Sequence, residues 1–474
     1  MINMQIRNPR TGQYDYNLSV DNPAFIHEKV ATLRQHQTAW KAAGLPHRIS
    51  ILQQWVERIK VHQDEIVEQL NMDTGRRSIA KTEVAALMGL IQAWSYRVPQ
   101  LYQTTARRPS ATNETIYIEQ QWVPYAVVGV ISPWNFPLLL AVIDSIPALL
   151  AGAAVALKPS EVTPRFMDPL EKSIQEVPAL AKVFSLARGG AETGKAIVEQ
   201  VDAICFTGSV PTGRKIAAAC AARFIPAFLE LGGKDPAIVL EDADLDLSSD
   251  AILRSCVGAT GQACQSLERI YVDEKIYPEF LALLTQKAKN VTLTIDPNQG
   301  QMGPIIFEKQ AEKIQTQIDE ALTKGAQLHH GGKVEQINGG FWCLPTILTE
   351  VDHQMSVMTE ETFGPVIPIM SFSTEEQAIA FANDSIYGLS ASVFSKDLDH
   401  ALRIAQQLEA GAISINDGSL TNRVFDAEKN SFKQSGINGS RMGDAGFLRF
   451  FRKKALLIQE GKPATMASFE EGEC

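Results

Sequence analysis

Short apolar segments alternate with helical segments from residue 123 onward, and this alternation constrains the fold more than any other feature of the chain. Apolar runs without polar alternation are typical of parallel strands covered by helices on both faces. Ligands of such sheets bind at the carboxyl ends of the strands, so we expect a site in the loops after residues 131, 158, 187 and 206. The predicted strands are 123–131, 154–159, 183–187, 203–206 and 224–231, with helices near 168–176 and 194–200.

The second half of the chain repeats this pattern and predicts a second α/β domain of about the same size. Residues 24–100, upstream of both, have apolar positions at close to a 3.6-residue period and are predicted to be helical. In the second half we expect helices at 249–259, 277–289, 308–324, 375–383 and 398–408, and strands at 236–240, 268–272, 365–372, 390–395 and 411–416.

Two strand-prone stretches lie outside this alternation. Residues 103–122 are polar and rich in Thr, and the tail RFFRKKALLIQEG (449–461) starts with basic residues. The first has little to bury in a local core and predicts a hairpin arm. Unpaired strand edges at both places would promote aggregation of a monomer, so we expect an oligomer. The polar run QLHHGGK (327–333) is predicted to be a turn.

Composition argues against several classes of function. A formal net charge of −10 offers no basic face to nucleic acid or to an anionic membrane. The most apolar run, 136–157, contains Pro137, Asp144, Ser145 and Pro147, which favours a buried helix and strand over a membrane span. The polar N-terminus has no apolar signal segment, so we expect a cytoplasmic location. No H-E-x-x-H or C-x-x-C spacing occurs, so we expect no protein-held metal.

The cysteines are scattered without any paired spacing, which predicts reduced thiols. One of them, Cys264, lies in GATGQACQSLERIYV (258–272) between small and polar residues, ahead of a predicted strand. Taken alone, this stretch favours a small structural thiol, because most cysteines are unreactive. Cys256, in the helix-like ILRSCVGAT, is the better structural candidate. The six cysteines are Cys205, Cys220, Cys256, Cys264, Cys343 and Cys474.

Three loops after strands are candidate phosphate or ribose sites. GGAETGKA (189–196) nearly matches a P-loop but has Ala196 where a metal-binding hydroxyl is required, which favours a plain strand-to-helix turn. TGSVPTG (207–213) places Gly208 and Ser209 at a helix N-terminus, which suits a pyrophosphate, although a structural turn explains it equally well. LKPSE (157–161) has a Lys and a Glu that could hold ribose hydroxyls, or only pair with each other on the surface.

Six motifs occur in a fixed order along the chain: PWNFP (133–137), LKPSE (157–161), FTGSVPTG (206–213), LELGGKDP (229–236), GQACQSLERIYV (261–272) and EETFGPV (360–366). Each is weak alone, but this order and spacing resemble the NAD(P)-dependent aldehyde dehydrogenase superfamily. The resemblance covers nearly the whole chain and is strongest between residues 120 and 420. It implies a small aldehyde as the substrate.

The resemblance implies three catalytic residues. Cys264 would be the nucleophile, whose thiolate adds to the aldehyde carbonyl so that the oxyanion can expel hydride. Asn135 and the Cys264 backbone N–H would stabilise that oxyanion. Glu230 would be the general base that hydrolyses the remaining thioester. CoA-acylating relatives typically lack this glutamate, so the free acid is the expected product. A CoA-acylating enzyme and a catalytically inactive homologue remain alternatives.

The resemblance also implies a cofactor site for NAD. A carboxylate at residue 161 can hold both ribose hydroxyls and would repel a 2′-phosphate, although NADP stays possible because of Ser160. Lys158 and Glu161 would contact the adenosine ribose, Ser209 the pyrophosphate, and Glu361 with Phe363 the nicotinamide ribose. The full set of implied cofactor residues is Trp134, Lys158, Ser160, Glu161, Gly208, Ser209, Gly232, Glu361 and Phe363.

The chain departs from the family near its C-terminus. The usual P-F-G-G-x-K-x-S-G reads EKNSFKQSG (428–436), and the following R-E-x-G reads SRMG (440–443). Because of these changes, neither the substrate preference of the family nor its second acid in a proton relay can be carried over to this chain. The aliphatic LLLAVI (138–143) has Ile143 where several relatives carry tryptophan, which favours an uncharged aldehyde. Gln265 and Arg423 leave a polar or acidic aldehyde as the alternative.

The expected fold is therefore α/β, with two parallel-sheet, Rossmann-like domains and a β-hairpin oligomerisation element. We expect a cofactor-binding domain at 1–103 and 124–231 and a catalytic domain at 232–440. The oligomerisation element would consist of 104–123 and 441–474. In the family, this hairpin completes a sheet with a neighbouring subunit, so the resemblance implies a homodimer or a homotetramer.

Overall fold

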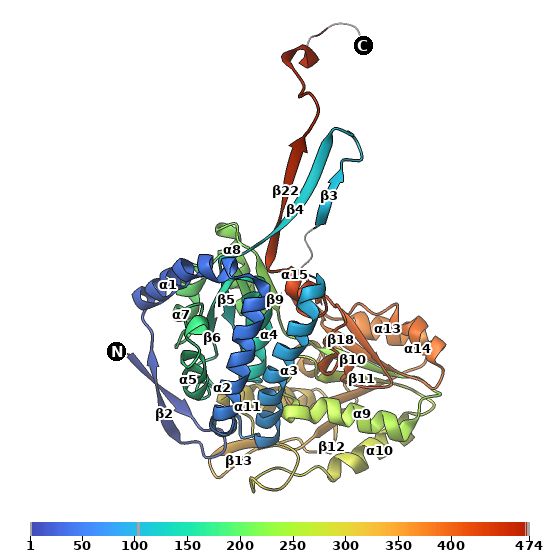
Figure 1. The fold of residues 1–474 in the computed structure, drawn as a ribbon. Helices are drawn as coiled ribbons and strands as arrows, with labels where there is room; N and C mark the ends of the chain where they lie inside the picture. Colours follow the sequence, from blue (N-terminus) through green and yellow to red (C-terminus); the bar gives the residue numbers. More distant parts are fainter. Residues whose placement is uncertain (1, 102–104, 470, 472–474) are drawn as a thin grey trace.

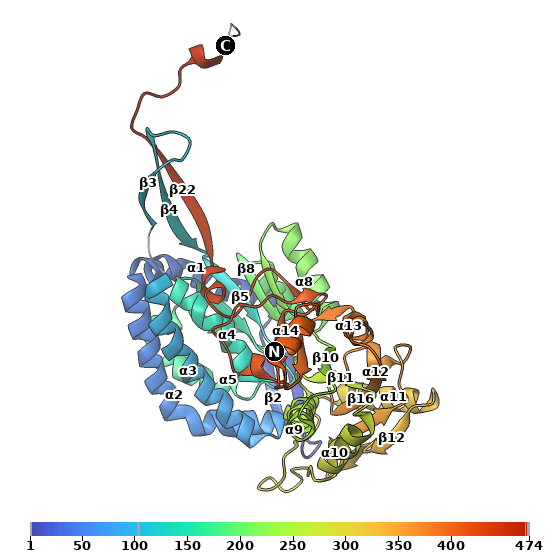
Figure 2. The ribbon, with the colours of Figure 1, turned by 90° about the vertical axis from the view of Figure 1, so that its right-hand side faces the viewer.

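The computed structural model describes residues 2–101, 105–469 and 471. Two α/β halves form the body, and an arm of three strands projects away from it (Figure 1). The same arm is seen from the side in Figure 2. Both halves contain a mostly parallel sheet, as the alternating pattern predicts, but each sheet has one antiparallel edge strand. The fold is thus α/β with two mixed sheets and several small antiparallel ones.

The first sheet has the order β21-β9-β8-β5-β6-β7. The chain runs from β5 through β6 to β7, then returns to β8 on the other side of β5. Since such crossovers are right-handed, α4 and α5 cover one face and α7 and α8 the other. The order therefore reverses between β5 and β8, where α/β sheets bind ligands. The strands are β5 (Val127–Ile131), β6 (Ala154–Lys158), β7 (Phe184–Leu186), β8 (Ala203–Thr207), β9 (Ala227–Glu230) and β21 (Gly436–Ile437).

The carboxyl ends of these strands lie level with one another. Ile131 pairs with Lys158 on one side and with Phe206 on the other, and Thr207 pairs with Glu230. The loops that follow these strands therefore meet along one edge of the sheet. The first half contains helices α1 (Pro23–Ala42), α2 (Gly44–Thr74), α3 (Arg77–Leu101), α4 (Pro137–Ala151), α5 (Met167–Gln175), α6 (Pro178–Ala181), α7 (Ala191–Val198) and α8 (Val210–Ala222).

The second sheet has the order β12-β15-β16-β11-β10-β18-β19. Its strands are β10 (Asp235–Val239), β11 (Leu267–Asp273), β12 (Gln327–His330), β15 (Thr346–Thr349), β16 (Val366–Phe372), β18 (Ser390–Phe394) and β19 (Ala412–Ile415). The chain passes from the carboxyl end of β9 to the amino end of β10 through four residues, 231–234. The carboxyl edge of the first sheet therefore faces the amino edge of the second.

Helices flank the second sheet, mostly within a few residues of the predicted ranges. They are α9 (Leu245–Val257), the 3-10 turn η1 (Gly258–Gly261), α10 (Tyr277–Lys289), α11 (Glu308–Thr323), α12 (Ser356–Thr359), α13 (Glu375–Asn383) and α14 (Leu398–Ala405). Helix α15 (Ala445–Leu448) instead packs against α4 of the first half. One apolar core lies in the first half, and residues 447–451 pack into it. Two further cores lie on the second sheet. The domain division remains a prediction, and its boundary at 103/104 lies outside the described residues.

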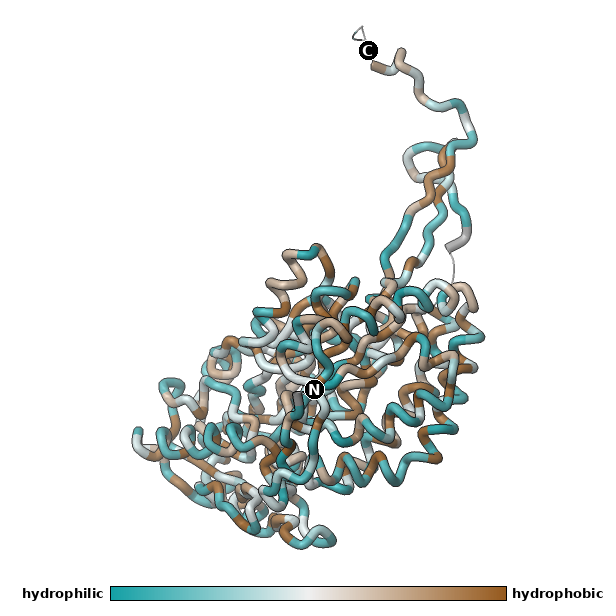
Figure 3. The backbone as a smooth tube through the Cα atoms, turned by 90° about the vertical axis from the view of Figure 1, so that its left-hand side faces the viewer, coloured by the Kyte–Doolittle hydropathy of each residue, from teal (hydrophilic) through white to brown (hydrophobic). Residues whose placement is uncertain are grey.

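The arm consists of β3 (Thr105–Pro109), β4 (Ile116–Pro124) and β22 (Phe451–Gln459). Strand β22 pairs along the whole length of β4, from Phe451 opposite Pro124 to Gln459 opposite Ile116. The hairpin and the tail thus pair with each other, so the prediction of unpaired edges at both places was only partly right. The arm still carries hydrophobic segments far from the core (Figure 3), among them Leu457, which is 71% exposed.

Other predictions about elements were wrong in detail. The strand predicted at 123–131 is divided, because Val123 and Pro124 continue β4 into the arm and the Tyr125 N–H donates to the Phe450 carbonyl at 3.1 Å. The predicted turn QLHHGGK begins with strand β12. Alternation did not reveal two small hairpins, β1 (Ile2–Arg7) with β2 (Tyr14–Val20) and β13 (Val334–Ile337) with β14 (Gly340–Cys343).

Candidate active site

A cavity of about 130 Å³ opens where the strand order of the first sheet reverses. Loops that follow β5, β8 and β9 form one side, and segments that precede β11 and β16 form the other. Most of the predicted site residues line this one space. They are Trp134, Asn135, Gly208, Ser209, Gly232, Cys264, Glu361 and Phe363. Glu230, Lys158, Ser160 and Glu161 do not line it.

The loop that carries Cys264 is held in an unusual backbone conformation. Ala259, Thr260 and Gly261 have φ values of 54°, 62° and 69°, in the left-handed region. A Cβ on Gly261 would lie 2.3 Å from the Gly364 backbone, so only glycine fits there. Gln262 is fully buried; its Nε2 donates to the Ala259 and Pro304 carbonyls at 3.1 and 3.2 Å, and its Oε1 accepts from the Ile306 N–H at 2.9 Å. These contacts fix the turn ahead of Cys264.

Cys264 differs from the other described cysteines in its exposure. Cys205, Cys220, Cys256 and Cys343 are buried, whereas Cys264 is partly exposed toward the cavity. Burial still raises the pKa of the Cys264 thiol to about 12, and the positive charge of Lys429 opposes this. The group is therefore a thiol at neutral pH and needs a proton acceptor before it can act as a nucleophile.

Asn135 lies between β5 and α4 and is 2% exposed. Its Nδ2 donates one hydrogen bond to the Gln262 carbonyl at 2.9 Å, which leaves a second N–H. The guanidinium of Arg76 donates to the backbone carbonyl of Asn135 and, at 3.2 Å, to the backbone carbonyl of Ala259. Arg76 thus ties the Asn135 loop of the first half to the Cys264 loop of the second.

Glu230 is the last residue of β9 and is not among the residues that line the cavity. Its Oε2 accepts from the Ser431 hydroxyl at 2.9 Å, and its Oε1 lies 4.0 Å from Nε of Arg441. Strand β21 pairs with β9 at this position, with Gly436 opposite Glu230. The divergent segment 428–443 therefore surrounds the carboxylate.

The opposite wall of the cavity carries Glu361 and Phe363, and Trp134 of the first side packs against it. The rings of Trp134 and Phe363 meet edge to face, with centroids 5.3 Å apart. Glu361 accepts from the Gly233 N–H at 3.2 Å, and a Cβ on Gly232 would lie 2.6 Å from its carboxylate. Burial, together with the nearby charge of Glu268, raises the pKa of Glu361 to about 8.

A buried ion pair holds this wall in place. Lys234 Nζ lies 2.7 Å from a Glu268 oxygen, and both side chains are essentially unexposed. The carboxylate of Glu268 also accepts from the backbone N–H groups of Thr362 and Phe363 at 2.6 and 2.7 Å. The pair therefore fixes the segment that carries Glu361 and Phe363.

Lys158, Ser160 and Glu161 lie at the carboxyl end of β6, one strand away from the cavity. Lys158 Nζ donates to Glu161 at 3.0 Å; Lys158 is buried and Glu161 is one-third exposed. The Ser160 hydroxyl accepts only a local bond from the Val162 N–H at 3.2 Å among the described contacts. Ser209 caps α8 with extended backbone, and its hydroxyl donates to Thr212 at 3.1 Å.

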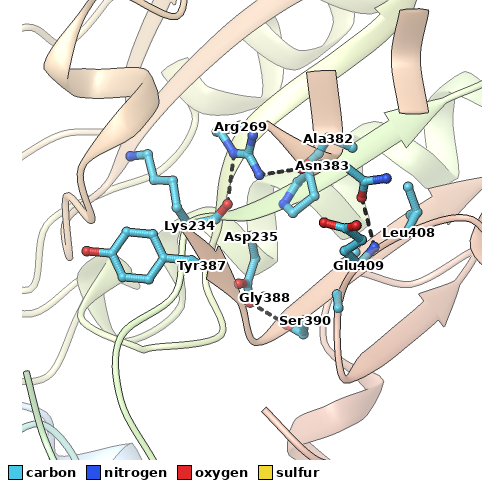
Figure 4. A pocket seen from close by; sticks show the side chains of 13 residues that line it. Lys234, Asp235, Arg269, Ala382, Asn383, Tyr387, Gly388, Ser390, Leu408 and Glu409 are labelled. Carbon is cyan, nitrogen blue, oxygen red and sulfur yellow. Dashed lines mark hydrogen bonds between the residues drawn. The ribbon is translucent and has the colours of Figure 1, made fainter. Parts of the chain in front are cut away.

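A small polar cavity of about 10 Å³ lies beside the start of β10, next to the segment that connects β9 to β10 (Figure 4). Arg269 Nε donates to the Lys234 carbonyl at 2.8 Å, and Nη2 donates to the Ala382 carbonyl at 2.8 Å. The Asp235 carboxyl accepts from the Ser390 hydroxyl, and burial raises its pKa to about 7. The cavity has room for about one water and not for a ligand. The hydrogen bonds beside it hold the start of β10 in place.

A second, larger cavity of about 530 Å³ lies between α3, α4 and segment 425–444. Ile143 of the predicted aliphatic wall lines it, as do Leu90, Trp94, Phe425 and Met442. Arg441 lines this cavity and donates to the hydroxyl of Thr207, which lines the first one. Of the polar candidates, Gln265 accepts from the Thr421 hydroxyl at 2.6 Å, and Arg423 is exposed.

Within the described residues, no cluster of three or more His, Cys, Asp or Glu side chains could hold a metal ion. None of the helices in that same part of the chain combines the length and the apolar character of a membrane span.

A thiol, an amide donor and a helix N-terminus thus share one cavity at a strand-order reversal. The sequence profile described as "Aldehyde dehydrogenase family" matches residues 2–456. The chain belongs to the aldehyde dehydrogenase family. It is therefore an NAD(P)-dependent oxidoreductase.

Solved structures resemble this aldehyde dehydrogenase over nearly its full length. The protein PutA from Anabaena variabilis is 49% identical, with a TM-score of 0.96 over 98% of this chain and 99% of that one. An aldehyde dehydrogenase from Mycobacterium tuberculosis, complexed with NAD+, is 32% identical, with a TM-score of 0.90 over 98% and 96%. An NADP-dependent enzyme from Escherichia coli is 30% identical, with a TM-score of 0.91 over 97% and 95% of the two chains respectively.

Several residues that shape the aldehyde dehydrogenase site were not found from the sequence. Arg76, Ser431 and Arg441 contact partners more than 50 positions away; the departure of segment 428–443 from the family pattern is the only local signal, and it marks the last two alone. A weak signal existed for the Lys234–Glu268 pair, since a charged residue in or beside a buried strand needs a partner. The role of Gln262 could have been suspected from its place in the G-Q-x-C motif.

Proposed function

We propose that this aldehyde dehydrogenase oxidises an aldehyde to the free carboxylic acid with NAD, through a thioester on Cys264. The observation that carries the proposal is the shared cavity: Cys264, Asn135, Gly208 and Ser209 line one space at the switch point. A nucleophile, an oxyanion donor and a dinucleotide cradle are the parts that this reaction requires together.

The first step is addition of the Cys264 sulfur to the aldehyde carbon, which forms a thiohemiacetal. The thiol first gives up its proton to a base, because burial raises its pKa to about 12. The carbonyl oxygen becomes an oxyanion and accepts from the second N–H of Asn135 and from the Cys264 backbone N–H. When bound, the oxidised nicotinamide supplies the hydride acceptor. Loss of hydride from the former aldehyde carbon leaves a thioester.

The second half of the reaction is hydrolysis, with Glu230 as general base. Water adds to the thioester carbon, its proton goes to the Glu230 carboxylate, and the C–S bond breaks to release the acid and the Cys264 thiolate. Glu230 at the end of β9, beside the cavity-lining Leu231 and Gly232, supports this role over CoA-dependent transfer. The presence of Cys264, Asn135 and Glu230 together argues against a catalytically inactive homologue.

The residues present fit a dinucleotide. Gly208 and Ser209 at the N-terminus of the 13-residue helix α8 suit the pyrophosphate. Lys158, Ser160 and Glu161 would face the adenosine ribose, and Trp134, Gly232, Glu361 and Phe363 the nicotinamide end. Glu161 supports NAD, because a carboxylate there repels a 2′-phosphate; Ser160 and the NADP-dependent relative keep NADP as the alternative.

The second cavity supports an uncharged aliphatic or aromatic aldehyde. Leu90, Trp94, Ile143, Phe425 and Met442 form the apolar part of its lining, which also includes Arg97, Asp426, Arg441 and Asp444. The polar alternatives have weaker support, because Gln265 already accepts from Thr421 and Arg423 is exposed.

We further propose a homodimer or homotetramer in the cytoplasm. Exposed apolar residues on the arm, such as Leu457, support burial of the arm against another subunit. The free described cysteines support a reducing compartment, whereas Cys474 lies outside the described residues.

The test combines product analysis with rapid kinetics. A panel of uncharged, aromatic and acidic aldehydes is assayed by NADH absorbance with NAD or NADP, with and without CoA. We expect free acid without CoA, no NADH from Cys264→Ala, and a single burst of NADH without turnover from Glu230→Gln. Acid formation that requires CoA, or full NADH production by Cys264→Ala, would contradict the proposal.

A further inference from the structure

Two side chains of the divergent segment 428–443 converge on Glu230. Ser431 donates to Oε2 at 2.9 Å, and Nε of Arg441 lies 4.0 Å from Oε1. Aligned with the family patterns given above, Ser431 stands at the second glycine of P-F-G-G and Arg441 at the glutamate of R-E-x-G. The chain therefore departs from its family at the two positions that face the proposed base.

Arg441 is anchored through Nη2, and its Nε is left without a hydrogen bond in the described part of the chain. It is 7% exposed, and its Nη2 donates to Asp144 at 2.8 Å and to the Thr207 hydroxyl. Asp144, itself buried, also pairs with Arg449. By contrast, Nε of Arg441 is buried without a hydrogen-bond partner among the described residues. A buried unpaired N–H is costly, so a carboxylate 4.0 Å away is its natural acceptor after a small shift.

The charged side chains around Arg441 form a group of two acids and two arginines. Asp144 and Glu230 supply two negative charges, and Arg441 and Arg449 supply two positive ones. Burial by itself would lower the pKa of Arg441, but the charges of Asp144 and Glu230 outweigh it and raise that pKa. The charge of Arg441 is thus matched by Asp144 and Glu230, which favours Glu230 as the partner of its Nε.

We propose that Arg441 and Ser431 are positioning residues that orient the Glu230 side chain for hydrolysis of the Cys264 thioester. The inference rests on the proposed function, because it concerns the hydrolytic step. Water's oxygen bonds to the acyl carbon, the C–S bond breaks, and Glu230 takes the proton. Arg441 cannot accept that proton. The proton therefore passes from Glu230 directly to solvent water and not to a second acid.

The experiment measures deacylation directly, by rapid quench and intact-mass detection of the acyl-enzyme, together with the NADH burst. Arg441→Met removes Nε at similar volume. We expect an unchanged burst rate constant and about tenfold slower acyl-enzyme decay, the loss of one hydrogen bond to a charged group. Arg441→Lys keeps the charge and should recover part of the rate. Ser431→Ala, in an exposed loop, should slow decay about threefold.

Arg449→Met is the matched control. It removes the other cation of Asp144, and the described ion pair of Arg449 is with Asp144 alone. Deacylation per active site should therefore keep the wild-type rate. If Arg449→Met slows decay as much as Arg441→Met, the effect belongs to the buried charge cluster and the proposal is wrong.

The remaining outcomes separate this inference from the function on which it rests. A purely structural role of Arg441 predicts that burst amplitude and turnover fall in equal proportion, with unchanged decay of the acyl-enzyme that forms. Unchanged decay in Ser431→Ala likewise contradicts the inference, even if Arg441→Met does not fold. If Glu230→Gln blocks decay while Arg441→Met and Ser431→Ala do not slow it, only the positioning role fails. If Glu230→Gln still turns over, both proposals fail.

Discussion

Replacement of Asn135 by alanine tests the oxyanion site most directly. The side chain is 2% exposed, and one of its two amide hydrogens is committed to the Gln262 carbonyl at 2.9 Å. One N–H therefore remains for the oxyanion of the proposed mechanism. Loss of one preorganised donor in a water-excluded site costs about 2.7–4 kcal/mol of transition-state stabilisation, or about 100- to 1,000-fold in kcat.

The same substitution has a structural cost that must be measured separately. The Gln262 carbonyl would lose a buried donor, which costs about 1–3 kcal/mol of folding free energy. Asn135→Asp keeps the shape but also loses the bond to the Gln262 carbonyl and adds a charge that repels an oxyanion, so a thermal melt of each variant separates the structural cost from the catalytic one. Ser132→Ala is the matched control on the same loop, since the buried Ser132 hydroxyl has no hydrogen-bond partner in the described structure.

The assay is NADH absorbance in stopped-flow and steady-state modes, with the KM for NAD and a thermal melt for each variant. We expect the burst rate constant and kcat to fall together in Asn135→Ala and at least as far in Asn135→Asp. The KM for NAD should stay unchanged, and Ser132→Ala should keep its turnover. An Asn135→Ala enzyme within about threefold of wild type, or an active Asn135→Asp enzyme, would refute the assigned role.

Two further predictions concern buried charges. Lys234→Met leaves the Glu268 carboxylate unpaired, so we expect about 3–5 kcal/mol lower stability in chemical denaturation and a raised KM for NAD. Lys234→Met combined with Glu268→Gln should recover most of the stability, and a double variant as unstable as the single one would contradict this. Burial raises the pKa of Glu83 from 4.5 to about 7, so its stabilising contribution is complete below about pH 4.5 and is lost as the pH rises through about 7. Glu83→Gln should remove this loss, on the order of 3 kcal/mol, in melts at pH 5 and pH 8, whereas parallel pH profiles would contradict it.

The alternation of apolar segments predicted both sheets, because a parallel strand buried on two faces has to be apolar throughout. Helices α10 (Tyr277–Lys289) and α13 (Glu375–Asn383) have their predicted bounds. Prediction failed where pairing is non-local: β4 runs through Val123 and Pro124 because β22, more than 300 residues later, pairs with it.

The residue types of the site were also readable, since each motif keeps its chemistry on a short local segment. A cysteine in G-Q-x-C, an asparagine in P-W-N-F-P and a glutamate in L-E-L-G-G carry their functional groups wherever the fold places them. The roles assigned to them remain proposals.

The sequence by itself therefore determined which groups this protein brings to its chemistry, and that its strands end in loops that carry them. Only the tertiary structure decided how they meet. Residues 231–234 place the amino edge of the second sheet opposite the carboxyl edge of the first. Cys264, which precedes β11, and Glu230, which ends β9, therefore come from facing edges of the two sheets. Arg76 and Arg441 contact residues far away in the sequence, and no local pattern predicts a contact that forms only when separate segments pack.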